Sequence, residues 1–434
     1  MPLDGKDSKT KTNVSADKPT TAIDRRTAVK AGGAAMMASL AGCIGGSGGG
    51  EGGPIKVGLL ADRSGSISVY GVPMTSATEL WQSEVNDNGG LLGREIELIK
   101  PDPQSSNQQY QNLARQLILE DNVDVLMGGI TSASREAIRE DIVDENQQLY
   151  FYPALYEGGI CDEYVYMTGP TPTQQLRPLV DYMMENFGSN VYTLAADYNF
   201  GQISALWADR YVSDNGGSIV GEEFIPLSVG DFGSTIDRVE SADPDWIMSL
   251  LVGNNHVSFF SQAESSGLQK PMASTVQIGA SYEHKTLSPP NLEGMHSAWN
   301  YVEELPTDRN QEFVDRFYDM FPDTQYINQH AQSQYISCLL YQAAVEQAGT
   351  TDQPEVNKAL ESGITVEAPQ GDVTVDPATH HLNHSITLNR VTEDHSLEFI
   401  NTTEGVEPTW LQERCNLATE STWDDPVSEF YQPE

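Results

Sequence analysis

Basic residues, cysteines and long apolar runs are all scarce in this sequence of 434 residues. Only 24 lysines and arginines stand against 63 aspartates and glutamates, which gives a formal net charge of −39. Such a charge argues against nucleic acid or an anionic membrane surface as the main partner. No segment has the length of continuous apolar sequence that a membrane-spanning helix requires. With 38% hydrophobic residues in periodic segments, the composition predicts a folded acidic protein and not a disordered one.

Lysine is the scarcer of the two cations. Beyond residue 42 the sequence contains only Lys56, Lys100, Lys270, Lys285 and Lys358. A surface of solvated carboxylates with few ammonium groups is typical of a protein adapted to high salt, where counterions screen the self-repulsion. The composition is therefore interpreted as halophilic, with an ordinary acidic protein as the alternative.

The four cysteines match no zinc-binding spacing. Cys43 is a candidate lipidation site, as described below, and an odd number then remains, so these cannot all pair with one another. Cys338 lies in a helical apolar run and is predicted to be a buried small hydrophobic residue. Cys161 and Cys415 are candidates for a disulfide in an exported protein, but the sequence does not place them within reach of each other.

The N-terminal segment has the order of an export signal followed by an anchor. Residues 24–43, "DRRTAVKAGGAAMMASLAGC", combine an arginine pair with a short, weakly apolar run, as in twin-arginine export. The ending Leu-Ala-Gly-Cys resembles a bacterial lipobox, in which Cys43 becomes the lipidated first residue. We therefore predict a signal segment at 1–42 and a Gly-rich tether at 43–54. The protein is expected to be exported and held by its lipid alone on the outer face of the cytoplasmic membrane.

Strand and helix patterns alternate from residue 55 onward and predict an α/β protein. Repeated β-α-β units predict doubly wound parallel sheets, and two successive sets of units predict two lobes joined by a hinge. We expect helices at 309–321 and 329–348 and a β-rich stretch at 371–401, which return to those lobes. The predicted division is lobe 1 at 55–170 and 299–350, lobe 2 at 171–298 and 351–404, and a C-terminal extension at 405–434.

Polar and aromatic side chains follow several of the predicted strands, where open α/β sheets bind their ligands. The stretch 148–159, "QLYFYPALYEGG", places Tyr150 and Tyr152 on one face of a strand that ends at Pro153. Hydroxyls, phenols and carboxamides follow three further strands, at 131–134, 197–200 and 253–255. This inventory suits a small neutral polar solute, and it is poor in the Arg or Lys expected around a carboxylate or phosphate.

Motifs of catalysis and of cofactor binding are absent from the sequence. There is no Gly-rich dinucleotide fingerprint, no phosphate-binding Gly-Lys-Ser/Thr and no nucleophile elbow, so no enzyme activity and no cofactor are predicted. The stretch "HHLNH" (His380, His381 and His384) is the one metal-like cluster. It lacks a cysteine or a matching acidic pattern nearby, and we predict no metal site there.

Several longer segments resemble the periplasmic urea- and short-chain-amide-binding proteins of ABC transporters. These segments include "NGGLLGREIELIKPDP", "SASREAIREDIVDENQQLYFYPALYEGG", "GPTPTQQLRPLVDYM", "ADYNFG" and "EAPQGDVTVDPATHHLNH". The resemblance implies a type I periplasmic-binding-protein fold and a partnership with permease subunits. It also implies amide contacts from Ser132, from the strand-end Tyr152 and from Tyr198, with Tyr150 packing behind.

Four further residues are predicted to line the same site: Ser134, Ala154, Phe200 and Asn254. Phe200 would form an apolar wall, and Ala154 shapes the space beside Tyr152. Asn254 stands where urea-binding relatives often carry an acidic residue, and "IGASYE" replaces their acidic segment. An acceptor for the N–H groups of urea is therefore expected from elsewhere in the chain.

Three alternative functions were weighed against binding of urea or a short amide. A transport protein for branched-chain or other amino acids would need an acidic partner for the ligand's ammonium group, and none is obvious. An amide-sensing regulator would need no export signal. A hydrolase would need a nucleophile and a base in the cleft, and the sequence offers no such pair.

Processing at Cys43 is the first testable prediction. Mass spectrometry of membrane-extracted protein should show a lipid on Cys43 and no residues 1–42. Cys43→Ser should release or misprocess the protein. A soluble product that retains the leader would contradict the lipobox interpretation.

Stability should depend on salt, because screening removes repulsion among the excess carboxylates. We expect a higher melting temperature in molar salt than in dilute buffer, as measured by circular dichroism. Equal melting temperatures in the two buffers would show that the halophilic interpretation is wrong.

Overall fold

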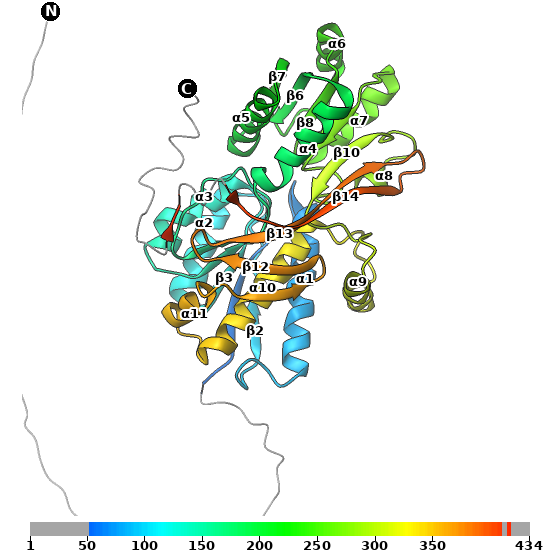
Figure 1. Cartoon of the computed structure of the whole chain (residues 1–434). Helices are drawn as coiled ribbons and strands as arrows, with labels where there is room; N and C mark the ends of the chain where they lie inside the picture. Colours follow the sequence, from blue (N-terminus) through cyan, green and yellow to red (C-terminus); the bar gives the residue numbers. More distant parts are fainter. Residues whose placement is uncertain (1–51, 410–414, 418–434) are drawn as a thin grey trace, which may run out of the picture. The chain divides into compact units, whose positions relative to one another are not determined.

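A buried parallel sheet forms the centre of the computed structural model, which describes residues 52–409 and 415–417 (Figure 1). Strand β1 (Ile55–Leu60) pairs in parallel with β2 (Ile96–Ile99) on one side and β3 (Val125–Gly128) on the other. Its side chains are buried on both faces except at Lys56, as expected for a parallel strand covered by helices on each side. The predicted α/β fold with a mostly parallel sheet is confirmed.

The remaining elements follow the predicted alternation. The first part continues with α1 (Ser68–Asp87), α2 (Asn107–Arg115), the π-helical turn η1 (Gln116–Glu120), α3 (Ser132–Ile138), the π-helical turn η2 (Arg139–Asp144), β4 (Tyr150–Tyr152) and β5 (Val165–Met167). The second part comprises α4 (Pro172–Phe187), β6 (Asn190–Ala196), α5 (Asn199–Asp214), β7 (Ser218–Ile225), α6 (Gly233–Ala242), β8 (Trp246–Leu250), α7 (Asn254–Ser266), β9 (Met272–Ser274), α8 (Glu283–Thr286) and β10 (Met295–Trp299). The chain then forms α9 (Asp308–Met320), α10 (Gln329–Ala348), α11 (Gln353–Leu360), β11 (Thr365–Ala368), β12 (Gly371–Asp376), β13 (His381–Val391) and β14 (Leu397–Val406).

The strands follow the order β2-β1-β3-β4-β5-β13-β10-β9-β8-β6-β7. Outside this order, β12 and β14 each pair with β13, and β11 pairs with β12. We call β2, β1, β3, β4 and β5 the first half-sheet, and β10, β9, β8, β6 and β7 the second half-sheet. Strand β13 joins them: His381 pairs in parallel with Met167 of β5, and the later residues run antiparallel to β10. The described order thus contains two parallel sets of strands linked through one long strand (Figure 1).

Helices cover both faces of each half-sheet. Val57 and Leu59 of β1 share a hydrophobic cluster with Ile336 of α10, whereas Leu60 packs on the other face with Leu117 of η1. The second half-sheet divides in the same way, with residues of β6 alternating between two clusters. This period-two alternation explains why the apolar runs of the sequence form strands that are covered on both sides.

One segment lies elsewhere than the predicted division places it. Residues 351–404 were assigned to lobe 2, yet α11 and the hairpin β11–β12 bury Val356, Val366 and Val375 in the cluster that contains β1 and α10. The apolar pattern predicts that this segment packs against a core, but the pattern is the same whichever core receives it. The division into two lobes stays a prediction.

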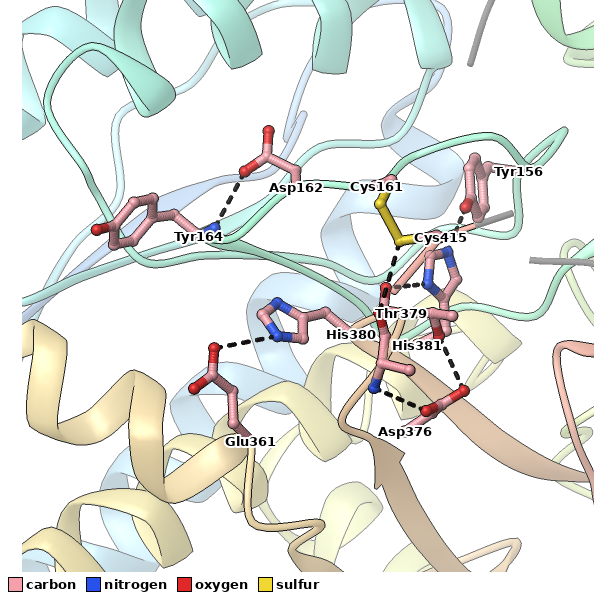
Figure 2. The surroundings of a disulfide bond; sticks show 11 residues. Tyr156, Cys161, Asp162, Tyr164, Glu361, Asp376, Thr379, His380, His381 and Cys415 are labelled. Carbon is pink, nitrogen blue, oxygen red and sulfur yellow. Dashed lines mark hydrogen bonds and ion pairs between the residues drawn. A yellow bond between two sulfur atoms is a disulfide. The ribbon is translucent and has the colours of Figure 1, made fainter. Parts of the chain in front are cut away.

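A disulfide joins Cys161 to Cys415, answering the question that the sequence left open (Figure 2). The two sulfur atoms are 2.02 Å apart and the two Cα atoms 5.7 Å apart. The backbone N–H of Leu417 donates to the carbonyl of Ala378 at 2.8 Å, so this end of the chain also contacts the β12–β13 turn. Cys338 is a free, fully buried thiol, as predicted.

The predicted signal segment, the lipobox with Cys43 and most of the tether lie outside the described residues. Among residues 52–409 and 415–417, no helix has the length and apolar character needed to cross a membrane.

Candidate ligand-binding site

A small cavity of about 30 Å³ lies at the carboxyl ends of the strands. Its lining is drawn from residues that follow β1, β3, β4, β6, β8 and β9, together with residues of α1 and α10: Ile67, Tyr70, Ile130, Thr131, Ser132, Leu155, Tyr198, Phe200, Val252, Val276 and His330. Both half-sheets contribute to it, and open α/β sheets bind their ligands at this edge. Because a water molecule needs roughly 10–15 Å³ of such space, the cavity has room for only a few non-hydrogen atoms.

Ser132 lines the cavity and is tied to a buried carboxylate. It begins α3 directly after β3, and its hydroxyl donates a hydrogen bond to Oε2 of Glu157. The other oxygen, Oε1, accepts from Nη2 of Arg135 at 2.8 Å. The side chains of Arg135 and Glu157 are only 2% and 4% exposed, so Ser132 belongs to a buried, charge-assisted network.

Arg135 holds this network together from the second turn of α3. Its Nε lies 2.7 Å from Oε1 of Glu136, and its guanidinium lies 5.0 Å from the ring centre of Tyr152 and 4.9 Å from that of Tyr156. Burial alone would lower the pKa of Arg135, but the carboxylates of Glu157 and Glu136 raise it well above its ordinary value. The guanidinium is therefore charged, and it lies within cation–π distance of both aromatic rings.

Tyr152 and Tyr150 both donate hydrogen bonds to backbone carbonyls after β3. The Tyr152 hydroxyl donates to the carbonyl of Ile130 at 2.7 Å, and the Tyr150 hydroxyl donates to that of Gly128 at 2.9 Å. Gly129 between these acceptors has φ +92°, and an added Cβ would lie 2.6 Å from the Tyr150 hydroxyl, so glycine is required there. Tyr152 is fully buried behind the cavity lining, and its direct contact with a ligand stays a prediction.

Tyr198 and Phe200 line the cavity just after the end of β6, and their contact with a ligand stays a prediction. The two rings lie 6.0 Å apart at the start of α5. Burial is the largest cause that raises the pKa of Tyr198 well above its ordinary value, and the nearby Tyr152 and Glu157 act in the same direction. Its phenol is therefore neutral and offers one donor and one acceptor.

Two other predicted site residues, Ser134 and Ala154, do not line the described cavity. Ser134 serves in the cap of α3, since its hydroxyl donates to the Thr131 carbonyl at 2.8 Å and its N–H donates to the Thr131 hydroxyl at 3.1 Å. Ala154 is fully buried outside the lining. Asn254 begins α7, and its side chain lies outside what the structure describes.

Two lining residues were missed because they come from helices and not from strand ends. Tyr70 of α1 accepts a hydrogen bond from the backbone N–H of Gly253 at 3.4 Å. Its ring centre lies 5.2 Å from that of His330 of α10. Burial lowers the pKa of His330 to about 3, so the cavity carries an uncharged imidazole, and no described residue forms a hydrogen bond with its Nδ1.

An acidic residue that the sequence did not reveal lies close to Tyr70. Glu283 is 2% exposed and lines a neighbouring hollow of about 170 Å³ together with His256. Its Oε1 lies 2.9 Å from Nε2 of His256, and it also accepts from the hydroxyl of Ser281. Burial alone would raise its pKa, but His256 and Ser281 lower the pKa of Glu283 to about 2.

A larger hollow of about 480 Å³ opens elsewhere in the second half-sheet. Its lining includes Lys270 and Met272 at the start of β9 and Met295 at the start of β10. These positions are at the amino ends of the strands, at the opposite edge from the small cavity. We therefore place the candidate site in the small cavity, where both half-sheets meet.

The histidines of "HHLNH" are engaged in separate contacts, and Figure 2 shows two of them, His380 and His381. His381 accepts from the hydroxyl of Tyr156, while its Nδ1 donates to the carbonyl of Thr379 at 2.6 Å. His380 stacks on the ring of Tyr166 at 4.3 Å, and Nδ1 of His384 lies 2.9 Å from the amide nitrogen of Gln370. Across residues 52–409 and 415–417, no group of three or more His, Cys, Asp or Glu side chains is arranged to hold a metal ion.

Comparisons with known proteins agree with the fold. Residues 54–396 match the family model described as periplasmic binding protein. A Leu/Ile/Val-binding protein homolog 6 from Brucella melitensis is 21% identical over 345 residues, which cover 78% of this chain and 87% of that protein. A Leu/Ile/Val-binding protein homolog 7 from Brucella suis is 23% identical over 337 residues, covering 72% and 82%.

Solved structures share the same fold. The solute-binding protein of an ABC transporter from Rhodopseudomonas palustris BisB5, in complex with 3,4-dihydroxybenzoic acid, has a TM-score of 0.74 at 23% identity and covers 82% of this chain and 99% of its own. A branched-chain amino acid ABC transporter periplasmic ligand-binding protein from Burkholderia xenovorans has a TM-score of 0.70 at 20% identity, covering 81% and 96%.

Acidification should destabilise the protein, because burial keeps several histidines neutral. It lowers the pKa of His296 and His381 to about 4 and of His330 and His384 to about 3. Below about pH 6.5 the unfolded chain takes up protons at these positions and the folded chain does not. Each of these histidines therefore lowers the free energy of unfolding by up to about 1.4 kcal/mol for each pH unit of acidification. Burial raises the pKa of Asp144 to about 8 and also raises the pKa values of Asp62, Glu222 and Glu303, and these groups act in the opposite direction.

Melting temperature at pH 7.5 and pH 5.5 in molar salt tests this expectation, and calorimetry reports the protons taken up on unfolding. The salt screens the carboxylates, so that the histidines dominate. A melting temperature that rises on acidification, with no proton uptake, would contradict it.

Proposed function

The chain belongs to the periplasmic binding protein family, and on that basis we propose that it captures urea or a short-chain amide. In this proposal the protein is the extracytoplasmic solute receptor of an ABC transporter and delivers its ligand to the permease subunits. It performs no covalent chemistry. The relatives named above are Leu/Ile/Val-binding protein homologs, and one solved structure holds 3,4-dihydroxybenzoic acid, so the choice of an amide rests on the cavity itself.

The distribution of donors and acceptors in the cavity carries the proposal. Among the described residues, its lining contains no Lys, Arg, Asp or Glu. The Ser132 hydroxyl has given its hydrogen to Glu157 and therefore presents lone pairs to an N–H group. The neutral phenol of Tyr198, in the same lining, offers a hydrogen to a carbonyl. An amide carries both complementary groups without a net charge.

The size of the cavity supports the same choice. At about 30 Å³ it suits a solute of a few non-hydrogen atoms, such as urea or acetamide. Leucine and benzoate are larger, and each brings a carboxylate that would meet no cation among the lining side chains. Ile67, Leu155 and Val276 supply the apolar walls that a methyl group of a short amide would contact.

The two predicted lobes supply the mechanism. We propose that the half-sheets belong to lobes that close around the ligand, with β13 among the segments that connect them. A ligand that contacts Ser132 after β3 and Tyr198 after β6 touches both sides, so it favours the closed arrangement. The closed form would then dock on the permease.

Export and anchoring complete the proposal. The twin-arginine leader and the lipid on Cys43 would place the receptor outside the cytoplasmic membrane, and the acidic surface would suit a salty medium. The same leader argues against an amide-sensing regulator.

Amino-acid binding is the second candidate, and Glu283 is the observation that favours it. A buried carboxylate beside Tyr70 is the kind of partner that an α-ammonium group needs. In this arrangement, however, Glu283 already faces His256 and lines the neighbouring hollow and not the small cavity.

A ligand panel distinguishes the candidates. Urea, formamide, acetamide, leucine and benzoate are titrated calorimetrically in molar salt, and melting temperature is followed in parallel. Urea or a short amide should bind and stabilise the fold, by about 2.7 kcal/mol at a ligand concentration of 100 Kd. Binding of leucine or benzoate without any amide binding would overturn the proposal.

Tyr152→Phe and Tyr150→Phe form a matched pair within this titration. Each removes one hydroxyl that donates to a backbone carbonyl, so their structural costs should be similar. If Tyr152 also contacts the ligand, Tyr152→Phe should lose a further 0.5–1.5 kcal/mol of binding free energy, rising to ~3 if a buried partner is left unpaired. This loss corresponds to a roughly 2- to 100-fold weaker affinity. Equal affinities in the two variants would remove Tyr152 from the site.

A further inference from the structure

The direction of one hydrogen bond fixes what the cavity can recognise. A serine hydroxyl ordinarily rotates to suit its partner and either donates or accepts. Ser132 has no such freedom, because its hydrogen is given to Oε2 of Glu157 and a carboxylate accepts without donating. The oxygen of Ser132 is left with only lone pairs for a ligand.

Glu157 is held firmly in the position that imposes this direction. Its Oε1 accepts from Nη2 of Arg135 at 2.8 Å, and both side chains are almost fully buried. Its backbone carbonyl accepts from the indole Nε1 of Trp207 in α5 at 2.9 Å. The carboxylate is therefore anchored from α3 through its side chain and from α5 through its main chain.

We infer that Glu157 is a positioning residue that selects an N–H donor over a carboxylate at the ligand site, acting through Ser132. This inference rests on the proposed function and names the residue behind its ligand preference. A ligand carboxylate at Ser132 would face lone pairs, with a second buried carboxylate directly behind them. Acetamide and acetate have nearly the same shape, so their relative affinity isolates this effect.

Replacing Glu157 by glutamine should reverse the direction of the hydrogen bond. Arg135 has only donors, so the carbonyl oxygen of the glutamine must face Arg135. The amide nitrogen then faces Ser132 and donates to its oxygen, which frees the serine hydrogen to point at the ligand. Glu157→Gln should therefore lower the ratio of acetamide to acetate affinity at least tenfold.

Glu136→Gln is the matched control. Glu136 is the other carboxylate on Arg135, at 2.7 Å from Nε, and its contacts are with Arg135 and Arg139 and not with Ser132. Like Glu157→Gln, Glu136→Gln removes one negative charge beside the Arg135 guanidinium. A merely structural or electrostatic effect should therefore appear in both variants. We expect the affinity ratio to change in Glu157→Gln and to stay near the parent value in Glu136→Gln.

Ser132→Ala provides the second control, because it removes the group through which Glu157 is inferred to act. In that background Glu157→Gln should no longer change the ratio. An unchanged ratio in Glu157→Gln, a change that persists without Ser132, or a parent protein that prefers acetate would each overturn the inference. If Glu157→Gln does not fold, Ser132→Ala alone decides the question. It should weaken acetamide binding at least threefold without weakening acetate binding. An equal loss of affinity for both ligands would overturn the inference.

A parent protein that binds no amide would defeat the proposed function, and the inference would then be decided by unfolding. Ser132→Ala, Glu157→Gln and the double variant form a cycle measured by chemical denaturation. A charge-assisted bond between the two side chains predicts non-additivity of about tenfold in the unfolding equilibrium constant. Additive effects would overturn the inference independently of any ligand.

Discussion

Taking two opposite charges out of water carries an effective cost of several kcal/mol for each ion, and the site is arranged around one such pair, Arg135 and Glu157. The cost is offset only where the remaining donors and acceptors are also used. The second oxygen of Glu157 accepts the hydrogen of Ser132, and Nε of Arg135 donates to Glu136, whereas Nη1 of Arg135 has no hydrogen-bond partner among the described residues. The guanidinium also lies within cation–π distance of two tyrosine rings. Helix α3, strand β4 and the segment after it are therefore fixed relative to one another before any ligand arrives.

The parts of the site that the sequence predicted are those that local geometry determines. In parallel sheets the carboxyl ends of the strands meet at one edge, so residues directly after the strands are the expected ligand contacts. That rule identified Ser132, Tyr198 and Phe200, all of which line the cavity. The alternation of strands and helices likewise predicted the fold class and the long helices α9 and α10.

The parts that were missed depend on tertiary contacts. Tyr70 and His330 reach the cavity from helix positions that have no distinguishing local pattern. Glu157 looks like a loop carboxylate in the sequence, and only its approach to Arg135 reveals its burial. Ser134 shows the converse error, since a hydroxyl at a helix start fits a ligand or a cap equally well, and the cap is what it forms. Residues 351–376 packed against the other core because an apolar pattern does not specify which core it will join.

The disulfide between Cys161 and Cys415 closes the segment between them into a covalent ring, from which the rest of the chain extends on both sides. The ring spans a sequence separation of 254 residues and includes every strand of the second half-sheet. A single cut anywhere between the two cysteines opens this ring without releasing a fragment. A protease in the surrounding medium must therefore cut twice, or act on reduced protein, before any piece of the second half-sheet can diffuse away.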